Sequence, residues 1–374
     1  MKLLIATDNF LPRWDGISRF LSEVVPRLKG FEVTILAPNF GKVPKKFKVK
    51  KVPLSNKSFG DFRIAKLKSD IIKREVEKND LIFVQTLGPI GFYSIRHARN
   101  LNKKVVSFVH SLEWELVPKA SKIPWVKKLI QPLAKTYSTW LHNKSDLLIV
   151  PAQSIAEKIS WLGLKSKKVV VNLGVDSEKF KPLKQREDVS RIEKIRKSLK
   201  LENSYVIGYH GRLAREKDIF TLLRAFKWMN RNHKDIKLLV VGDGLKEIKN
   251  KLEATPNVVW VPAKDDVQNY LNLMDCYVTP STTETTSLTT LEALSSGLPV
   301  LSTPVGFISD YIKDGYNGII FPIGKAYTLY KFLELVKQSP GLARDLGRRG
   351  RRTIIEKFSW EKASININKA LKEA

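Results

Sequence analysis

The sequence contains a single cysteine, Cys276, among 374 residues, which excludes an internal disulfide. It also has no apolar run near the roughly 18 residues that a membrane-spanning helix needs. The N-terminal segment meets an acid at Asp8, too early for a secretory signal sequence. We therefore expect a globular protein in the cytoplasm, either free or peripherally bound to the inner face of the membrane.

Several motifs that identify common enzyme classes are also missing. The chain has neither a Gly-x-x-x-x-Gly-Lys phosphate loop nor a Gly-x-Ser-x-Gly nucleophile motif. No Gly-x-Gly-x-x-Gly dinucleotide fingerprint follows any expected strand, and one cysteine cannot supply the usual zinc-binding pairs. These absences argue against a nicotinamide or flavin enzyme and against a structural zinc site.

What the sequence has in excess is positive charge. Sixty-six Lys and Arg face 37 Asp and Glu, giving a net charge of +29 and a pI near 10.0. Residues 1–180 hold 33 Lys and Arg against 15 Asp and Glu, a net charge of +18. Such an excess indicates an anionic partner: a negatively charged membrane face, nucleic acid or phosphorylated small molecules.

Short apolar runs alternate with segments of helical periodicity, which predicts parallel sheets covered by helices on both faces. One series occupies residues 1–176 and includes an expected helix over 64–78; a second begins at the strand 205–210. A charged segment, 179–200, separates the two series. We expect two doubly wound domains, 1–176 and 177–357, with a last helix at 358–374 that packs back on the first.

The most informative stretch is 280–297. It follows the apolar run 276–279 and predicts a strand, a Thr- and Ser-rich loop, a short helix and another strand. A helix N-terminus beside such a loop offers backbone N–H groups to an anion such as a diphosphate. Glu284 lies in the loop, and Glu292 lies about two turns into the helix, where it could accept hydrogen bonds from sugar hydroxyls.

Four motifs occur in order along the chain: Asp15-Gly16-Ile17, His110, Gly211 to Lys217, and Glu284 to Glu292. Together they resemble the retaining, sugar-nucleotide-dependent glycosyltransferases of family 4, over essentially the whole chain. The resemblance implies the α/β GT-B fold, in which two Rossmann-like doubly wound domains face a central cleft. The N-terminal domain would bind the acceptor and the C-terminal domain the nucleotide-sugar donor.

The same resemblance implies a reaction and a set of roles. A hexose would move from a UDP-glucose-type donor or GDP-mannose to an acceptor hydroxyl with retained configuration, without a cofactor or a divalent metal. Arg212 and Lys217 would hold the donor diphosphate, Glu284 would face the transferred sugar, and Glu292 would bind the ribose. The residues expected to take part in catalysis are His110, Glu284, Arg212 and Lys217.

The expected donor site extends to the backbone around these side chains. Gly16 would let the first loop approach the phosphates, and His110 would position a sugar hydroxyl. The remaining donor-binding residues by resemblance are Thr285, Thr286, Ser287 and Leu288.

The sequence departs from the family pattern at three places. Asp15 stands where a glycine is usual, and Thr285-Thr286-Ser287 replaces Gly-Phe-Gly. The hydroxyls of Thr285, Thr286 and Ser287 are our hypothesis for substitute phosphate donors. Asp218 replaces another glycine, and we predict that it caps the following helix.

The acceptor is suggested by residues 114–140, where large aromatics alternate with lysines. The residues concerned are Trp114, Trp125, Trp140, Lys119, Lys122, Lys127, Lys128 and Lys135. Such a segment suits anionic lipid headgroups, which favours a lipid or polyprenyl-linked acceptor at the cytoplasmic membrane face. An ordinary amphipathic helix pair with buried Trp explains it equally well.

Other functions stay open. The enzyme could use a soluble sugar or sugar-phosphate acceptor instead. A basic nucleic-acid-binding protein is favoured by charge alone, and no recognition module is visible. A GT-B phosphorylase or sugar-nucleotide epimerase would share the fold, but the Glu284 to Glu292 spacing with Arg212 and Lys217 favours a transferase.

Overall fold

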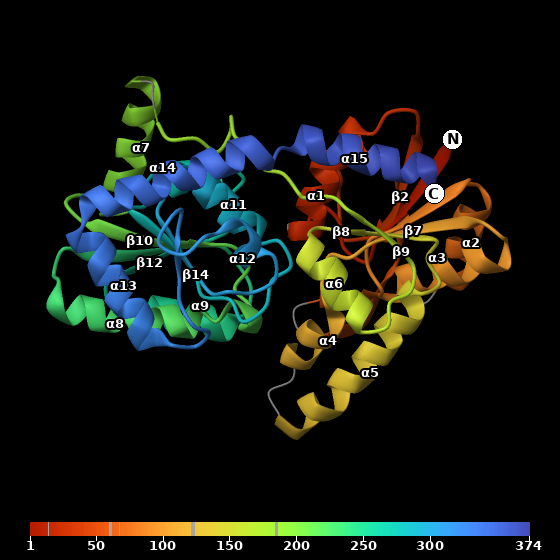
Figure 1. The fold of residues 1–374 in the computed structure, drawn as a ribbon, viewed down its shortest axis with the longest axis horizontal. Helices are drawn as coiled ribbons and strands as arrows, with labels where there is room; N and C mark the ends of the chain where they lie inside the picture. Colours follow the sequence, from red (N-terminus) through yellow and green to blue (C-terminus); the bar gives the residue numbers. More distant parts are fainter. Residues whose placement is uncertain (14, 60–61, 67, 121–123, 184–185) are drawn as a thin grey trace. The chain divides into compact units, whose positions relative to one another are not determined.

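The computed structural model describes residues 1–13, 15–59, 62–66, 68–120, 124–183 and 186–374. The chain divides into two compact units (Figure 1). The first consists of Met1–Leu173 and Trp360–Ala374, and the second of Gly174–Ser359. The expected division was at 176 and 357, a few residues from these boundaries. Each unit is built on its own parallel sheet, and each is described by itself.

The sheet of the first unit has the strand order β3-β2-β1-β6-β7-β8-β9, with parallel neighbours throughout. Strands β6 and β8 are apolar at every position and buried along their whole length, as expected when helices cover both faces. The strands are β1 (Lys2–Ala6), β2 (Glu32–Pro38), β3 (Val49–Val52), β6 (Leu81–Val84), β7 (Lys104–Phe108), β8 (Leu147–Val150) and β9 (Lys167–Val170).

Helices cover this sheet on both faces. Helix α15 packs on α1 and on the short 3₁₀ turn η1, whereas α2 and α3 pack together. The core beneath α2 and α3 joins their apolar residues to strand residues such as Leu4, Leu36 and Ile82. The helical elements are α1 (Gly16–Val24), η1 (Val25–Arg27), α2 (Ser69–Glu77), α3 (Pro89–Asn100), α4 (Glu113–Leu116), η2 (Val117–Ala120), α5 (Pro124–His142), α6 (Gln153–Trp161) and α15 (Trp360–Glu373).

The prediction of a helix over residues 64–78 is wrong in its first turn. Strands β4 (Leu54–Phe59) and β5 (Phe62–Ala65) form an antiparallel hairpin, and helix α2 begins only at Ser69. Leu54 pairs with Ala65, and the Lys66 N–H donates to the carbonyl of Pro53 at 2.7 Å. These partners lie outside the local sequence window, so helical periodicity alone could not detect them.

The sheet of the second unit has the order β12-β11-β10-β13-β14-β15 and is also parallel. Figure 1 shows helices α8, α9 and α13 along one face of it, where their apolar residues form one core with β10, β11 and β13. The strands are β10 (Tyr205–His210), β11 (Ile236–Val241), β12 (Val258–Val261), β13 (Cys276–Thr279), β14 (Val300–Ser302) and β15 (Ile319–Ile320). The helical elements are α7 (Arg186–Ser198), η3 (Arg215–Lys217), α8 (Ile219–Asn232), α9 (Lys246–Glu253), α10 (Val267–Leu271), α11 (Leu288–Ser295), α12 (Ile308–Tyr311), α13 (Ala326–Gln338) and α14 (Pro340–Lys357).

The strand order reverses at one point in each sheet. In the first unit β1 lies between β2 and β6, and in the second β10 lies between β11 and β13. From β1 or β10 the chain builds strands on one side of that strand first and on its other side later. The loops that follow the two neighbouring strands at this point therefore run in opposite directions. Such switch points are where open α/β sheets bind their ligands.

The last helix, expected at 358–374, is present: α14 ends at Lys357 and α15 begins at Trp360. Phe358 packs edge-on against Phe307 and Tyr311 in the second unit, with centroid distances of 5.8 and 5.7 Å. Trp360 instead packs on Phe20 in the first unit, at 6.3 Å. The last helix therefore belongs to the first unit although the helix before it belongs to the second.

Candidate active site

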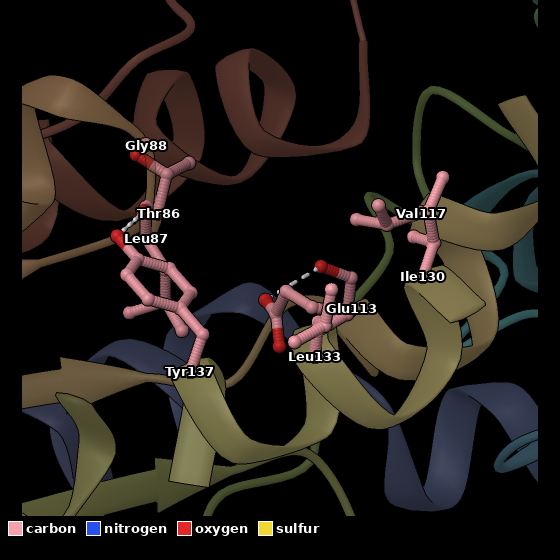
Figure 2. A pocket seen from close by; sticks show the side chains of 10 residues that line it. Thr86, Leu87, Gly88, Glu113, Val117, Ile130, Leu133 and Tyr137 are labelled. Carbon is pink, nitrogen blue, oxygen red and sulfur yellow. Dashed lines mark hydrogen bonds between the residues drawn. The ribbon is translucent and has the colours of Figure 1, made fainter. Parts of the chain in front are cut away.

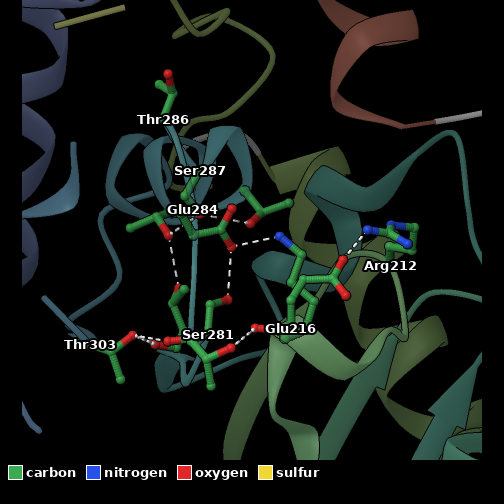
Figure 3. Close-up of polar contacts among 12 residues, drawn as sticks. Arg212, Glu216, Ser281, Glu284, Thr286, Ser287 and Thr303 are labelled. Atoms are coloured by element: carbon green, nitrogen blue, oxygen red, sulfur yellow. Dashed lines mark hydrogen bonds and ion pairs between the residues drawn. The ribbon is translucent and has the colours of Figure 1, made fainter. Parts of the chain in front are cut away.

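Two loops meet at the switch point of the second unit. Lys217 ends η3, just after β10, and Glu284 lies in the loop after β13. Lys217 Nζ is 2.6 Å from Glu284 Oε1, and Ser281 Oγ donates to the same oxygen at 2.8 Å (Figure 3). The exposed fractions of the Lys217 and Glu284 side chains are only 19% and 9%. The pair is therefore shielded from solvent, which strengthens its electrostatic attraction.

Arg212 and Glu216 form a second pair beside the first. The Arg212 guanidinium donates to Glu216 Oε1, and the backbone carbonyl of Glu216 accepts from Thr282 N–H at 2.7 Å. This last bond ties the loop after β10 to the loop after β13. The two cations predicted to hold a diphosphate thus lie in the same loop after β10, each beside one carboxylate.

The loop that carries Arg212 depends on two glycines of the next crossover. A Cβ at Gly242 would lie 1.9 Å from the carbonyl oxygen of Gly211, and one at Gly244 would lie 2.2 Å from that of Leu213. Leu213 N–H donates to Asp243 O at 2.8 Å, and Leu245 N–H to Leu213 O at 2.8 Å. This close backbone approach is possible only without side chains, and it fixes the position of residues 211–213.

The backbone of residues 285–287 is fixed by hydrogen bonds to other parts of the second unit. The carbonyl of Thr285 accepts from Phe307 N–H at 2.7 Å, and that of Thr286 accepts from Tyr311 Oη–H at 3.0 Å. Ser287 has a φ of +56°, in the left-handed region that glycine adopts most easily. The conformation of the loop therefore explains why a glycine is usual at this position.

The hydroxyls of this loop differ in their availability. Ser287 Oγ shares a 2.8 Å hydrogen bond with Thr290 Oγ1, which in turn is 2.8 Å from Thr279 Oγ1. Thr286 Oγ1 is buried and has no hydrogen-bond partner among the residues that the structure describes. Leu288 is the first residue of α11, the helix whose N-terminal N–H groups were predicted to face an anion.

Glu292 lies in the middle of α11 and is almost fully buried. Its Oε2 is 3.1 Å from Nε2 of His210, the last residue of β10. The His210 carbonyl accepts from Tyr277 Oη–H at 3.0 Å, so β10, β13 and α11 meet at this point. Sequence reasoning missed His210, although its place at the end of a buried strand and directly before Gly211 could have indicated it.

In the first unit, His110 follows β7 and stacks on Phe108, with 4.3 Å between the ring centroids. Its Nε2 is 2.8 Å from Gln85 Oε1, while Gln85 Nε2 points to the carbonyl of Phe83 at 3.5 Å. Gln85 therefore accepts, and His110 carries its proton on Nε2. Burial lowers the pKa of His110 to about 3, so the imidazole is neutral near pH 7.

Gly16 begins α1, and a Cβ there would meet no atom within 4 Å. Packing inside the first unit therefore does not explain this glycine. Asp15 caps the helix by accepting from Ser18 N–H at 2.9 Å, and it also accepts from Asn9. The departure from glycine at position 15 thus supplies a helix cap.

The predicted helix cap at Asp218 is confirmed. Its carboxylate accepts from Thr221 N–H at 3.3 Å and from Thr221 Oγ1 at 2.6 Å, at the start of α8. Asp218 itself has a φ of +45°, which accounts for the glycine common at this position.

The aromatic segment 114–140 divides into two kinds of environment. Trp114 is buried, whereas Trp125 and Trp140 are exposed on α5 together with Leu129 and Leu133. Lys128 and Lys135 are exposed on the same helix, and the side chains of Lys119, Lys122 and Lys127 lie outside the described residues. Trp114 is thus a core residue, as the amphipathic helix pair requires, and lipid contact by Trp125 and Trp140 stays a prediction.

Two kinds of feature are absent from the part of the chain that the structure describes. No three His, Cys, Asp or Glu side chains converge in a way that could hold a metal ion. Within the same ranges, no helix combines the length and the apolar character that crossing a bilayer requires.

The sequence also matches known protein families. Residues 14–179 match the model described as Glycosyltransferase Family 4, and residues 190–353 match Glycosyl transferases group 1. The chain is 23% identical to an alpha-monoglucosyldiacylglycerol synthase of Acholeplasma laidlawii, over 93% of this chain and 91% of that protein. It is 29% identical to the capsular polysaccharide biosynthesis glycosyltransferase CapM of Staphylococcus aureus, over 61% of this chain and 62% of CapM.

Solved structures bear on the fold. Anabaena HepE, determined in complex with UDP-glucose, superposes with a TM-score of 0.81 at 18% identity and covers 100% of both chains. WaaG, a glycosyltransferase involved in lipopolysaccharide biosynthesis, gives a TM-score of 0.76 at 15% identity, again over both whole chains.

Proposed function

The chain belongs to the family 4 glycosyltransferases and has their GT-B fold, and from this premise we propose that it is a retaining hexosyltransferase. It would move a hexose from a nucleotide-sugar to an acceptor hydroxyl. The observation that carries the proposal is the juxtaposition of Arg212–Glu216 and Lys217–Glu284 at the switch point of the second unit. A site for a charged leaving group needs paired cations at such a place.

The donor is proposed as a UDP-glucose-type sugar or GDP-mannose. HepE was solved with UDP-glucose, and a GDP-mannose-dependent alpha-mannosyltransferase of Mycobacterium tuberculosis is 25% identical over 350 residues. Arg212 and Lys217 would bind the diphosphate by charge-assisted hydrogen bonds. Glu284 would accept from hydroxyls of the transferred sugar, and Glu292 from those of the ribose.

The proposed reaction is a displacement on one face of the sugar. The bond from the anomeric carbon to the diphosphate oxygen breaks, and the acceptor oxygen bonds to the same face of that carbon. The acceptor proton passes to the departing phosphate oxygen, so no protein base is required. Arg212 and Lys217 stabilise the charge that develops on the diphosphate, and neutral His110 orients a sugar hydroxyl.

The acceptor is proposed to be lipid-linked or polyprenyl-linked and to be reached at the cytoplasmic face of the membrane. The exposed side chains Trp125, Leu129, Leu133 and Trp140 support this, as does the +18 charge of residues 1–180. The matched alpha-monoglucosyldiacylglycerol synthase is named for a lipid product. Anionic vesicles should therefore co-sediment the protein at low salt and release it at high salt.

The donor part is tested by thermal shift with UDP-glucose, GDP-mannose and ADP-glucose. A donor at 100 times its Kd stabilises the folded state by about 2.7 kcal/mol, which raises the melting temperature measurably. Replacement of Lys217 by Ala should reduce that stabilisation to about half at the same donor concentration, because a tenfold weaker Kd leaves about 1.4 kcal/mol. EDTA should not change it. A wild-type chain that responds to none of these sugars and hydrolyses none of them would contradict the proposal.

A further inference from the structure

The first unit contains a cavity of about 490 Å³ (Figure 2). Its walls come from the loops after β6 and β7, from the start of α4, from η2 and from α5. The residues that matter most are Leu87, Glu113, Val117, Ile130, Leu133 and Tyr137. The volume lies within the roughly 300–1,000 Å³ of small-molecule sites, and the cavity is at the carboxyl ends of β6 and β7.

The cavity is mostly apolar, with one carboxyl group inside it. In Figure 2 the Glu113 carboxyl lies between Tyr137 on one side and Val117 and Ile130 on the other. Glu113 Oε1 accepts from Ser111 Oγ at 3.0 Å. Oε2 is buried and has no hydrogen-bond partner within the described part of the chain. A buried polar atom without a partner is costly, and a ligand that donates a hydrogen bond would remove that cost.

The other side chains that line the cavity indicate which ligand charge it can accept. Tyr137 Oη already donates to the carbonyl of Leu87 at 2.8 Å, so its proton is not offered to a ligand. No Lys or Arg occurs among the described residues that line the cavity. Burial raises the pKa of Glu113 to about 7, and a phosphate beside it would add a second negative charge. The polar end of the ligand is therefore not a phosphate or another anion, and a neutral hydroxyl can supply the hydrogen bond that Glu113 Oε2 lacks.

The apolar wall continues onto the surface of the protein. Leu133 and Tyr137 line the cavity, yet 69% and 39% of their area is exposed. Leu129 and Trp125 lie about one and two turns before Leu133 on the same helix and are also exposed. An alkyl chain leaving the cavity would therefore remain on apolar surface along α5.

We propose that this cavity is the acceptor subsite and that it takes a neutral, hydroxyl-bearing lipid. The hydroxyl donates to Glu113 Oε2, and the first part of the hydrocarbon chain packs on Val117, Ile130 and Leu133. This inference rests on the proposed function and adds that the acceptor group is an uncharged glycerol-type or sugar hydroxyl rather than a phosphate. Glu113 is then a binding residue for the acceptor.

Calorimetric titration of the full chain with 1-decanoylglycerol, below its micellar concentration, tests this directly. We expect saturable binding at one site, and binding of 1-decanoyl lysophosphatidic acid that is roughly tenfold or more weaker. Ala134→Phe fills the cavity and Glu113→Leu removes the carboxyl, so each should weaken 1-decanoylglycerol roughly tenfold. Thr136→Phe introduces the same side chain at an exposed position of the same helix outside the cavity and should leave affinity unchanged.

Two further measurements separate the subsite from folding and from the proposed function. Glu113→Gln keeps a hydrogen-bonding group and should restore most of the affinity lost in Glu113→Leu. Equal affinity for both decanoyl probes, unchanged affinity in Ala134→Phe, or binding only to vesicles would overturn the subsite. A wild-type chain that binds 1-decanoylglycerol but no nucleotide-sugar would refute the proposed function. The cavity would then still be a lipid-binding site.

Discussion

Lys217 and Glu284 are 67 residues apart in the chain and form a 2.6 Å ion pair between the loops that follow β10 and β13. Arg212 is also paired with a carboxylate, that of Glu216 four residues later in the same loop. The two cations proposed to bind the donor diphosphate are therefore already neutralised by carboxylates. An anionic donor must share these cations with Glu284 and Glu216, which makes the carboxylates part of the affinity for nucleotide.

This pairing predicts opposite effects for its two partners. Glu284→Gln should bind UDP several-fold more tightly, because Lys217 no longer shares its charge, and should lower transfer roughly 100-fold. Lys217→Met should weaken UDP roughly tenfold and destabilise the fold by about 2 kcal/mol, since it leaves Glu284 buried and unpaired. Calorimetry and chemical denaturation measure these changes.

The control for that experiment is Lys337→Met, which removes an ion pair of 2.8 Å with the half-exposed Asp235 elsewhere in the second unit. UDP affinity should be unchanged in it. If Glu284→Gln weakens UDP as much as Lys217→Met does, the carboxylate does not compete with the diphosphate.

Ser287 combines a left-handed backbone with a useful side chain. Ser287→Ala loses the hydrogen bond to Thr290 and keeps the backbone strain, so it should destabilise by about 1 kcal/mol. Ser287→Gly loses the same bond and relieves the strain, so its free energy of unfolding should lie close to wild type. Urea denaturation distinguishes the two, and equal losses in both variants would show that the strain is negligible.

The glycine contact beneath Arg212 can be tested against a matched glycine. Gly242→Ala places a Cβ 1.9 Å from Gly211 O at a φ of +155° and should cost about 3 kcal/mol or more. It should also weaken UDP binding, since it displaces residues 211–213. Gly341→Ala, in α14 with no atom within 4 Å of the new Cβ, should stabilise by about 0.5 kcal/mol. Thermal melts of both variants, with and without UDP, provide the comparison.

Acid sensitivity should come partly from His142, whose two ring nitrogens are buried without hydrogen-bond partners in the described structure. Burial lowers its pKa from 6.5 to about 4. Between these values the unfolded chain binds a proton that the folded chain does not, so stability rises with pH across this window and is lost as pH falls.

Replacing His142 by Leu removes that titration. The stability of the variant should depend less on pH between about 4 and 6.5, by up to about 1.4 kcal/mol per pH unit, and should differ least from wild type at pH 8. Urea denaturation at pH 5, 6 and 8 checks this. A variant with the wild-type slope would show that His142 does not account for the acid sensitivity.

The local order of the fold was predictable because it depends on neighbouring residues. The strands Tyr205–His210 and Cys276–Thr279 occur where the apolar runs predicted them, and the last helix begins within two residues of the expected position. Asp218 caps α8 as expected, since a cap needs only the residues that follow it. The prediction of a helix over 64–78 was wrong in its first turn, because Ala65 pairs with Leu54 in a hairpin.

The sequence by itself determined the alternation of strands and helices, the division into two series and the motifs that place this chain among the family 4 glycosyltransferases. These features repeat at short range, where spacing and residue type are sufficient. Only the tertiary structure decided that Lys217 is paired with Glu284, that His210 lies against Glu292, and that Glu113 is enclosed in an apolar cavity. Each of these depends on which loops the parallel crossovers bring to one edge of a sheet, and on how much water the packing removes, neither of which a local pattern records.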